Sequence, residues 1–186
     1  LLFGSTTLMM SSMEEMTVGS VEENQNWDIQ ANVLFGGEDE VIEWVNDKGG
    51  YHERIITFPA NPVNDSRVIS ANGMDVLSTE SGALIRLDLK EGKMPEEGRQ
   101  TNQILIDEGL NHFLGWERGE FQTLMFGSTS ASVEIVGITQ GEMSRTIYFH
   151  RSDLAKIVGI EATSVLIDLP DGAVPDSDLG NASLVV

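Results

Sequence analysis

The residues of this chain best suited to acid-base or metal chemistry are its three histidines, His52, His112 and His150. No two of them lie at the i, i+4 spacing that places two metal ligands on one face of a helix. The sequence contains no cysteine, which excludes a thiol nucleophile, a thiolate metal site and a disulfide framework. We therefore interpret the histidines as surface or structural residues.

A Ser-His-Asp triad needs an activated serine, and the sequence shows no sign of one. There is no G-x-S-x-G elbow, and the segment Phe126-Gly127-Ser128-Thr129, which repeats Phe3-Gly4-Ser5-Thr6, implies no nucleophile geometry. Neither of the phosphate-binding loops G-x-x-x-x-G-K-[ST] and G-x-G-x-x-G occurs. We therefore assign no catalytic or cofactor-binding residue and expect the chain not to be an enzyme.

An acidic cluster and one tryptophan could each form a binding site, but each also has a purely structural interpretation. The acidic residues near the C-terminal end could hold calcium through oxygen ligands, but they lack the EF-hand pattern, and a solvated loop is the favoured interpretation. These residues are Asp168, Asp171, Asp176 and Asp178. Trp116, between Gly115 and Gly119, could be an exposed binding aromatic, but core packing under the turn is favoured. No metal ligand is assigned.

Composition limits the partners of this chain. A length of 186 residues suits one domain, which can have two lobes. The net charge of −19 argues against nucleic acid or an anionic lipid surface as a partner, because phosphates would be repelled. No stretch approaches the roughly 20 apolar residues of a membrane span. The chain begins Leu1-Leu2-Phe3, without an initiator Met or a basic segment, and we interpret it as a piece of a larger protein.

The clearest local structure is predicted for residues 104–139. Residues 104–106 form a buried strand, and Asp107 follows where a helix N-cap is expected. Leu110, Phe113 and Leu114 repeat at i, i+3 and i+4, which predicts a short helix with one apolar face that ends at Gly115. A turn over residues 117–120, a strand over 121–126 and another from Val133 to Ile138 complete this stretch.

The N-terminal part predicts a β-α-β unit. Residues 1–20 are a helix whose apolar content fades, either the outer end of a membrane helix or an amphipathic helix docked on the domain. Residues 27–35 alternate apolar and polar side chains, as in a half-buried strand. Residues 38–48 form a helix with an acidic first turn, and residues 54–58 form the second strand. Pro59 and Pro62 then indicate a loop.

The middle of the chain predicts an inserted lobe. A strand over residues 68–71 leads to a turn at Asn72-Gly73, and a polar connection over residues 74–82 marks the boundary. Residues 84–89 alternate as a strand, with Ile85, Leu87 and Leu89 on one face. Residues 91–103 are expected to be a flexible loop.

The C-terminal part predicts a second β-α-β unit. It consists of a strand over residues 146–149, a helix capped by Ser152 that stops at Gly159, and a strand over residues 164–169 with a turn at Asp171-Gly172. Residues 181–186 are either a strand or a stub returning to a membrane. The expected fold class is α+β, with two β-α-β units and an insertion that is mostly β.

Several of these pieces resemble, in order and spacing, the extracytoplasmic domain of the FtsX-like ABC-transporter permeases, called the MacB-like periplasmic core domain. The similar segments are Asn26-Trp27-Asp28-Ile29-Gln30-Ala31, Leu89-Lys90-Glu91-Gly92-Lys93-Met94-Pro95, residues 104–107, Leu114-Gly115-Trp116-Glu117-Arg118-Gly119-Glu120 and Glu134-Ile135-Val136-Gly137-Ile138. Glu120 departs from the Asp that is more frequent in the family, and both are acidic turn residues.

The resemblance implies two lobes: a porter-like α/β lobe of residues 21–76 and 143–186, and a smaller inserted lobe of residues 77–142, with residues 1–20 as the end of a membrane helix or stalk. It implies a non-catalytic domain on the extracytoplasmic side of the cell membrane, which couples ATP-driven conformational change to export or release of a substrate. The implied partners are a cytoplasmic ABC ATPase reached through the rest of the permease, a second permease copy, and an extracytoplasmic adaptor or cargo.

Two alternatives remain open. One is a free-standing cell-surface module that binds a ligand or protein between its lobes. The other is a hydrolase whose catalytic residues come from distant segments, which predicts converging carboxylates or a histidine in a pocket.

Overall fold

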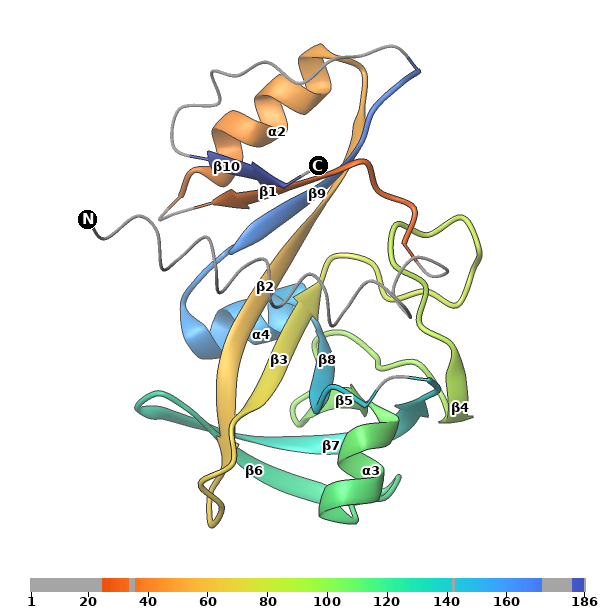
Figure 1. Ribbon diagram of the computed structural model, residues 1–186. Coiled ribbons are helices and arrows are strands. Elements are labelled where there is room, and N and C mark those ends of the chain that lie inside the picture. Colours follow the sequence, from red (N-terminus) through yellow and green to blue (C-terminus); the bar gives the residue numbers. More distant parts are fainter. Residues whose placement is uncertain (1–24, 34–35, 142, 172–181, 186) are drawn as a thin grey trace, which may run out of the picture.

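The computed structural model describes residues 25–33, 36–141, 143–171 and 182–185. Three helices and ten strands are assigned in these residues (Figure 1). In chain order they are β1 (Ile29–Val33), α2 (Glu38–Asp47), β2 (Tyr51–Pro62), β3 (Ile69–Met74), β4 (Leu89–Gly92), β5 (Asn102–Ile106), α3 (Glu108–Leu114), β6 (Phe121–Phe126), β7 (Thr129–Thr139), β8 (Thr146–His150), α4 (Arg151–Val158), β9 (Ser164–Asp168) and β10 (Ala182–Val185). The expected mixture of helices and strands is present.

All ten strands belong to one mixed sheet. Its order is β10-β1-β9-β2-β3-β8-β5-β7-β4, and β6 pairs with both β2 and β7. The pairs β3-β8 and β5-β7 are parallel, whereas β5-β8 and β2-β6 are antiparallel. The strands of residues 77–142 are thus hydrogen-bonded directly to strands from both flanking parts of the chain.

Both expected β-α-β units are present, but in each unit other strands of the sheet lie between the unit's two strands. In the first, β1, α2 and β2, strand β9 lies between β1 and β2 and is antiparallel to each, so β1 and β2 run in the same direction. In the second, β8, α4 and β9, strands β2 and β3 lie between β8 and β9. The helix of the first unit begins with Glu38, Asp39 and Glu40, which favour the positive end of the helix dipole.

Strand β2 is longer than predicted and runs through much of the length of the molecule (Figure 1). It spans 12 residues, including Pro59 and Pro62, where the sequence indicated a loop. Pro59 fits this strand. On one side it pairs with Ser70 of β3, and on the other side the pairing of β2 with β9 ends at Ile55, before Pro59 is reached. The missing N–H of Pro59 therefore costs no ladder bond to β9.

Apolar side chains are buried in three clusters. One lies between α2, β1 and β9 and includes Ile29, Ala31, Val33, Val41, Val45, Val165 and Ile167. A second packs against α3 and α4 and includes Ile56, Ile69, Ile104, Ile106, Leu110, Leu124, Ile135, Phe149 and Leu154. A third includes Ile55, Met74, Leu84, Leu87, Leu105, Val136, Tyr148 and Leu166. The second and third clusters take side chains from residues 77–142 and from both flanking parts, so these parts share their cores.

The first and last strands of the described chain are neighbours. β10 pairs with β1 antiparallel, with Gln30 opposite Val185 and Val33 opposite Ala182. The start of β1 therefore lies beside the end of β10, at the end of the molecule that carries α2 (Figure 1). Of residues 181–186, for which a strand or a stub was expected, Ala182–Val185 form a strand.

The predicted turn at Asn72-Gly73 is wrong, because both residues lie within β3 and pair with Thr57 and Ile56. Gly73 is required there for a different reason. A Cβ atom on Gly73 would lie 3.1 Å from the Cα of Arg151 and from the Cβ of Leu154. The glycine thus lets α4 pack closely on the sheet.

The strand predicted for residues 84–89 is also wrong. Only isolated bridges occur at Ile85 and Arg86, and the strand β4 begins at Leu89. Leu84 and Leu87 are the buried residues of this segment, so it covers the third cluster without the alternation of a strand. The following loop is held by hydrogen bonds, because the Gly98 N–H donates to the Asp153 carboxylate at 3.0 and 3.2 Å.

The helix α4 does not use Ser152 as its N-cap. His150 is the N-cap residue and makes no side-chain cap bond, while Ser152 lies inside the helix and its hydroxyl donates to Glu97. β8 passes directly into the helix, so that Arg151 takes the first helical position. Gly159 ends the helix in a left-handed conformation, as predicted. The helix expected over residues 1–20 and the turn residue Gly172 lie outside the described residues.

Candidate functional site

The buried carboxylate of Asp107 organises one end of the molecule. Asp107 is 0% exposed and caps α3, as predicted, by accepting a hydrogen bond from the Leu110 N–H at 2.8 Å. Its other oxygen accepts from the Ser144 hydroxyl at 3.0 Å and from the Thr146 N–H at 2.9 Å. One side chain therefore fixes both the start of α3 and the segment that enters β8.

The segment between β7 and β8 is held against α3 at further points. Glu108 accepts from the Gly141 N–H at 3.3 Å and forms an ion pair with Lys90 of β4. The backbone of Met143 lies against Gly109, where a Cβ atom would come within 2.9 Å of the Met143 Cα. The position of this segment is thus set by Asp107, the N-cap of α3, and by Glu108 and Gly109 within α3.

An open cleft of about 170 Å³ lies between these elements. It is lined by Lys90, Glu108, Asn111, His112 and Met143. This volume is below the roughly 300 Å³ at which pockets for drug-sized ligands begin. Within the described residues, no group of three or more His, Cys, Asp or Glu is placed to hold a metal ion. No serine is among the residues that line the cleft.

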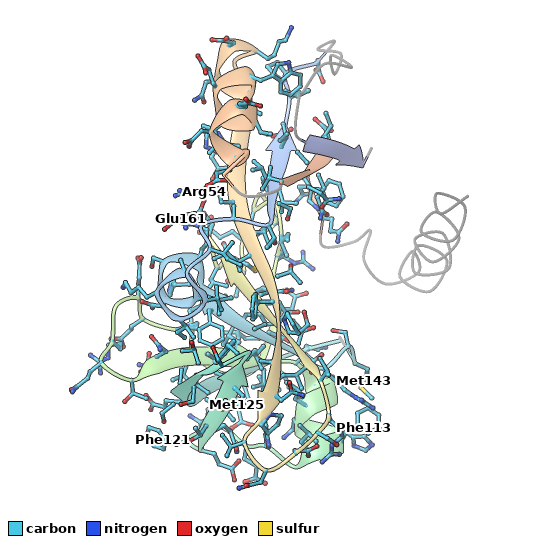
Figure 2. All side chains as sticks on the ribbon, turned by 90° about the vertical axis from the view of Figure 1, so that its left-hand side faces the viewer. Arg54, Phe113, Phe121, Met125, Met143 and Glu161 are labelled. Atoms are coloured by element: carbon cyan, nitrogen blue, oxygen red, sulfur yellow. The ribbon has the colours of Figure 1, made fainter. Side chains whose placement is uncertain are left out.

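Beside the cleft, α3 and the segment before β8 expose two apolar side chains and one cation, which we name the Arg145 surface: Phe113, Met143 and Arg145. Phe113 is 49% and Met143 55% exposed. The guanidinium carbon of Arg145 lies 5.7 Å from the centroid of the Phe113 ring, within the range of a cation–π contact. Figure 2 shows Phe113 and Met143 on the same side of the lower end of the molecule.

The exposure of Phe113 corrects the prediction that it lies on the buried face of α3. Leu110 is fully buried and Leu114 packs against the second cluster, as predicted. Phe113 instead meets the ring of His112 edge-on, at a centroid distance of 5.0 Å. The helix has seven residues and only a narrow buried face, which Leu110 and Leu114 already fill.

A second polar cluster lies in the middle of the molecule, where β2, β3 and α4 meet. Asp75 accepts from the Arg54 N–H at 2.8 Å and from the Arg54 side chain at 3.0 Å, and it also pairs with Arg151. Arg151 donates in addition to the backbone carbonyl and the carboxylate of Glu161, at 3.0 and 2.9 Å. Figure 2 labels Arg54 and Glu161, both below α2 in that view. Burial would raise the pKa of Asp75, but hydrogen bonds from Arg151 and Arg54 outweigh it and lower the pKa.

Glu53 is buried beside this cluster. Only 3% of it is exposed; one oxygen accepts from the Tyr51 hydroxyl at 3.1 Å, and the other has no hydrogen-bond partner. Burial raises the pKa of Glu53, the Tyr51 hydrogen bond opposes this, and the charge of Asp75 adds to the rise. We assign this carboxyl group no catalytic role.

The three histidines lie on different elements and do not converge. His52 is on β2, His112 is exposed on α3, and His150 ends β8 with its Nε2 atom 2.9 Å from the Pro95 carbonyl oxygen. Ser128 lies in the tight turn between the end of β6 at Phe126 and the start of β7 at Thr129.

Trp116 is 7% exposed and belongs to the second cluster, which confirms the prediction of core packing. Its backbone carbonyl accepts from the Asn111 side chain at 2.8 Å. Of the acidic residues considered for calcium, Asp168 and Asp171 are described and exposed, whereas Asp176 and Asp178 lie outside the described residues.

Sequence reasoning missed Arg145. A single arginine in a polar connection carries no periodic or motif signal. Its distinguishing property is the backbone, because it has φ +59° and is the one non-glycine residue with positive φ in the part of the chain that the structure describes.

Most of the chain has a fold similar to that of known extracytoplasmic domains. It superposes on the periplasmic region of MacB from Actinobacillus actinomycetemcomitans with a TM-score of 0.53 at 11% identity, covering 91% of this chain and 93% of that one. It superposes on the extracellular domain of the ABC-type transporter YknZ from Gram-positive bacteria with a TM-score of 0.51 at 14% identity, covering 77% and 84%. No protein-family model and no curated protein matches the sequence.

Proposed function

We propose, from the fold shared with the MacB and YknZ domains, that this chain is a non-catalytic extracytoplasmic domain of an ABC-transporter permease. In this role it couples ATP-driven conformational change to export or release of a substrate outside the membrane. Its partners are a cytoplasmic ABC ATPase, reached through the rest of the permease, and a second permease copy. The likeness in fold over nearly the whole chain is the observation that carries this proposal.

The placement of the first and last strands supports the proposal. A domain inserted between two membrane segments needs its incoming and outgoing chains on one side. The pairing of Gln30 with Val185 brings the start of β1 and the end of β10 together at the α2 end of the molecule. None of the described helices has the length and apolar character that a membrane crossing requires.

The buried clusters that the two lobes share support the proposal that the domain moves as a rigid body. In the proposal, residues 21–76 and 143–186 form the porter-like lobe and residues 77–142 the smaller lobe. Side chains of both lobes pack in one cluster, as Ile56 and Phe149 do with Ile104 and Ile135. Packed cores resist continuous deformation, so the two lobes would rotate together as one body.

The location can be tested by labelling the full-length protein in intact cells. In a full-length protein whose other cysteines are replaced by serine, a cysteine at the exposed residue Thr123 supplies one reactive thiol, because this chain itself contains no cysteine. The proposal predicts that a membrane-impermeant maleimide labels this thiol in intact cells as fully as in permeabilised cells. Labelling only after permeabilisation would exclude an extracytoplasmic domain. In a free-standing surface module, the same thiol would be labelled but no ABC ATPase would copurify.

A further inference from the structure

Arg145 is a basic residue that forms no ion pair with any acidic side chain in the described part of the chain. The chain has 11 Lys and Arg against 30 Asp and Glu, so carboxylates are in large excess. Among the described residues, ion pairs engage Arg54, Arg67, Arg86, Lys90, Lys93, Arg99, Arg118, Arg151 and Lys156. The Arg145 side chain is exposed, and its guanidinium lies over the ring of Phe113.

The backbone holds Arg145 in a costly conformation. A left-handed conformation disfavours a side chain with a Cβ atom, and such strain persists where the surroundings enforce it. Here Asp107 enforces it, because its buried carboxylate binds Ser144 before Arg145 and Thr146 after it. The Arg145 carbonyl also accepts from the Ser70 N–H at 3.0 Å. A glycine or asparagine would fit this backbone with less strain.

The same carboxylate also positions the apolar part of the surface. By capping α3, Asp107 fixes the helix that presents Phe113, and the contact of Gly109 with Met143 places the methionine beside it. An unpaired guanidinium, an exposed aromatic ring and an exposed methionine are thus held in one preorganised arrangement. Arg, Met and aromatic residues are the types enriched in protein interfaces.

We propose that the Arg145 surface binds an apolar segment of another protein that presents a single carboxylate, from a side chain or a chain end, to the Arg145 guanidinium. The fork of Arg matches a carboxylate with two hydrogen bonds, and Phe113 and Met143 would cover the neighbouring apolar side chains. The net charge of −19 selects against an acidic stretch, an anionic lipid surface or a second copy of this chain. The partner therefore carries one carboxylate in apolar or basic surroundings.

The surface lies at the end of the molecule opposite β1 and β10 (Figure 1 and Figure 2). In the proposed function that end is farthest from the membrane. The inference rests on the proposed function only for the compartment in which the partner is found. It is tested separately, because cross-linking at this surface does not depend on the result of cysteine labelling.

The test places the photocrosslinking amino acid p-benzoylphenylalanine at Met143 of the full-length protein in its own cells. Mass spectrometry then identifies the cross-linked segment. The expected product joins the photocrosslinking residue at position 143 to a segment of another protein that has one Asp, Glu or C-terminal carboxylate among apolar residues. In the Arg145→Asn variant the yield should fall at least about tenfold, the effect of losing one charge-assisted contact.

Two controls make the result specific. Asn adopts the left-handed conformation more readily than Arg, so Arg145→Asn should melt at the same or a higher temperature, and its loss of product cannot come from unfolding. Arg118→Asn removes an exposed arginine that pairs with Glu91 and should leave the yield unchanged. Cross-links to lipid or to a second copy, no product, or a yield that Arg145→Asn does not lower would each overturn the proposal.

Discussion

Gly92 and Gly137 lie directly opposite each other on the neighbouring strands β4 and β7. A Cβ atom on Gly92 would lie 2.2 Å from the Val136 carbonyl oxygen and 2.6 Å from the Cα of Gly137. A Cβ atom on Gly137 would lie 2.8 Å from the Lys93 carbonyl oxygen. Two of the sequence segments that resemble the permease family therefore meet in one backbone contact that excludes side chains.

Replacing Gly92 with alanine should strongly destabilise the fold. Gly92 has φ +92°, and the added Cβ atom would collide with backbone that cannot move aside as a flexible side chain can. We expect the backbone strain alone to cost about 1–3 kcal/mol, with the collision adding to it. Urea denaturation of Gly92→Ala, compared with the parent chain, measures the total.

Gly119→Ala is the matched control. Gly119 has φ +91°, nearly the same backbone conformation, but nothing lies within 4 Å of its added Cβ atom. This variant should show the strain without the collision and so lose less stability than Gly92→Ala. Equal losses for the two variants would mean that the contact with Gly137 does not restrict position 92.

Asp107→Asn should loosen both α3 and the segment before β8. An amide can still accept from Leu110, but its NH2 group then faces the Thr146 N–H, which leaves a buried donor unsatisfied. We expect a loss of about 1–3 kcal/mol in the free energy of unfolding. Hydrogen exchange should speed up at the amides of Leu110 and Thr146.

Ser144→Ala provides the comparison for Asp107→Asn. It removes one of the hydrogen bonds to Asp107 and the contact with the Thr146 hydroxyl, both at an exposed residue, and should cost about 0.5–1.5 kcal/mol. If Asp107→Asn were no more damaging than Ser144→Ala, Asp107 would not be the residue that organises this end of the molecule.

Glu53→Gln should stabilise the protein at neutral pH. The pKa of Glu53 is raised in the folded state, so between its ordinary value of 4.5 and the folded value the folded chain binds more protons than the unfolded chain. The free energy of unfolding of the parent chain therefore falls as the pH rises through this window. Gln does not ionise and keeps an acceptor for Tyr51, so the variant avoids this fall. Thermal unfolding from pH 4 to 7 should show the gain only above about pH 4.5. A variant less stable than the parent at pH 7 would contradict this.

Asp75 should have the opposite pH dependence. The hydrogen bonds of Arg151 and Arg54 lower its folded pKa below the ordinary 3.8, so its contribution is fully present above that value and is lost as the pH falls through the folded pKa. The difference in unfolding free energy between the parent chain and Asp75→Asn should shrink below about pH 3.8. A difference that does not change with pH would exclude this ion pair as a source of stability.

Local signals in the sequence predicted local structure well. Asp107 and Gly115 act within a few residues of their own helix, so the boundaries of α3 could be read directly. Gly159 ended α4 for the same reason. Pro59 and Gly73 were misread because their roles depend on which strand or helix lies beside them, and that is decided by residues far away in the chain.

The candidate site was less accessible to sequence reasoning than the fold. The helical repeat placed Phe113 on the apolar face but could not show how much of that face the core would cover. Arg145 gave no signal at all, since its isolation from carboxylates and its backbone strain exist only in three dimensions. The resemblance of ordered segments to a family indicated the fold because it used spacing across the whole chain.

The most direct test of the central claim follows the domain during the ATPase cycle in the full-length permease dimer. Spin labels at the exposed residues Glu43 on α2 and Thr123 on β6 report distances within one copy, and labels at Thr123 alone report the distance between copies. We predict that ATP with vanadate changes the distance between copies and leaves the distance within a copy unchanged. An unchanged distance between copies would contradict a domain that couples ATP-driven motion to transport.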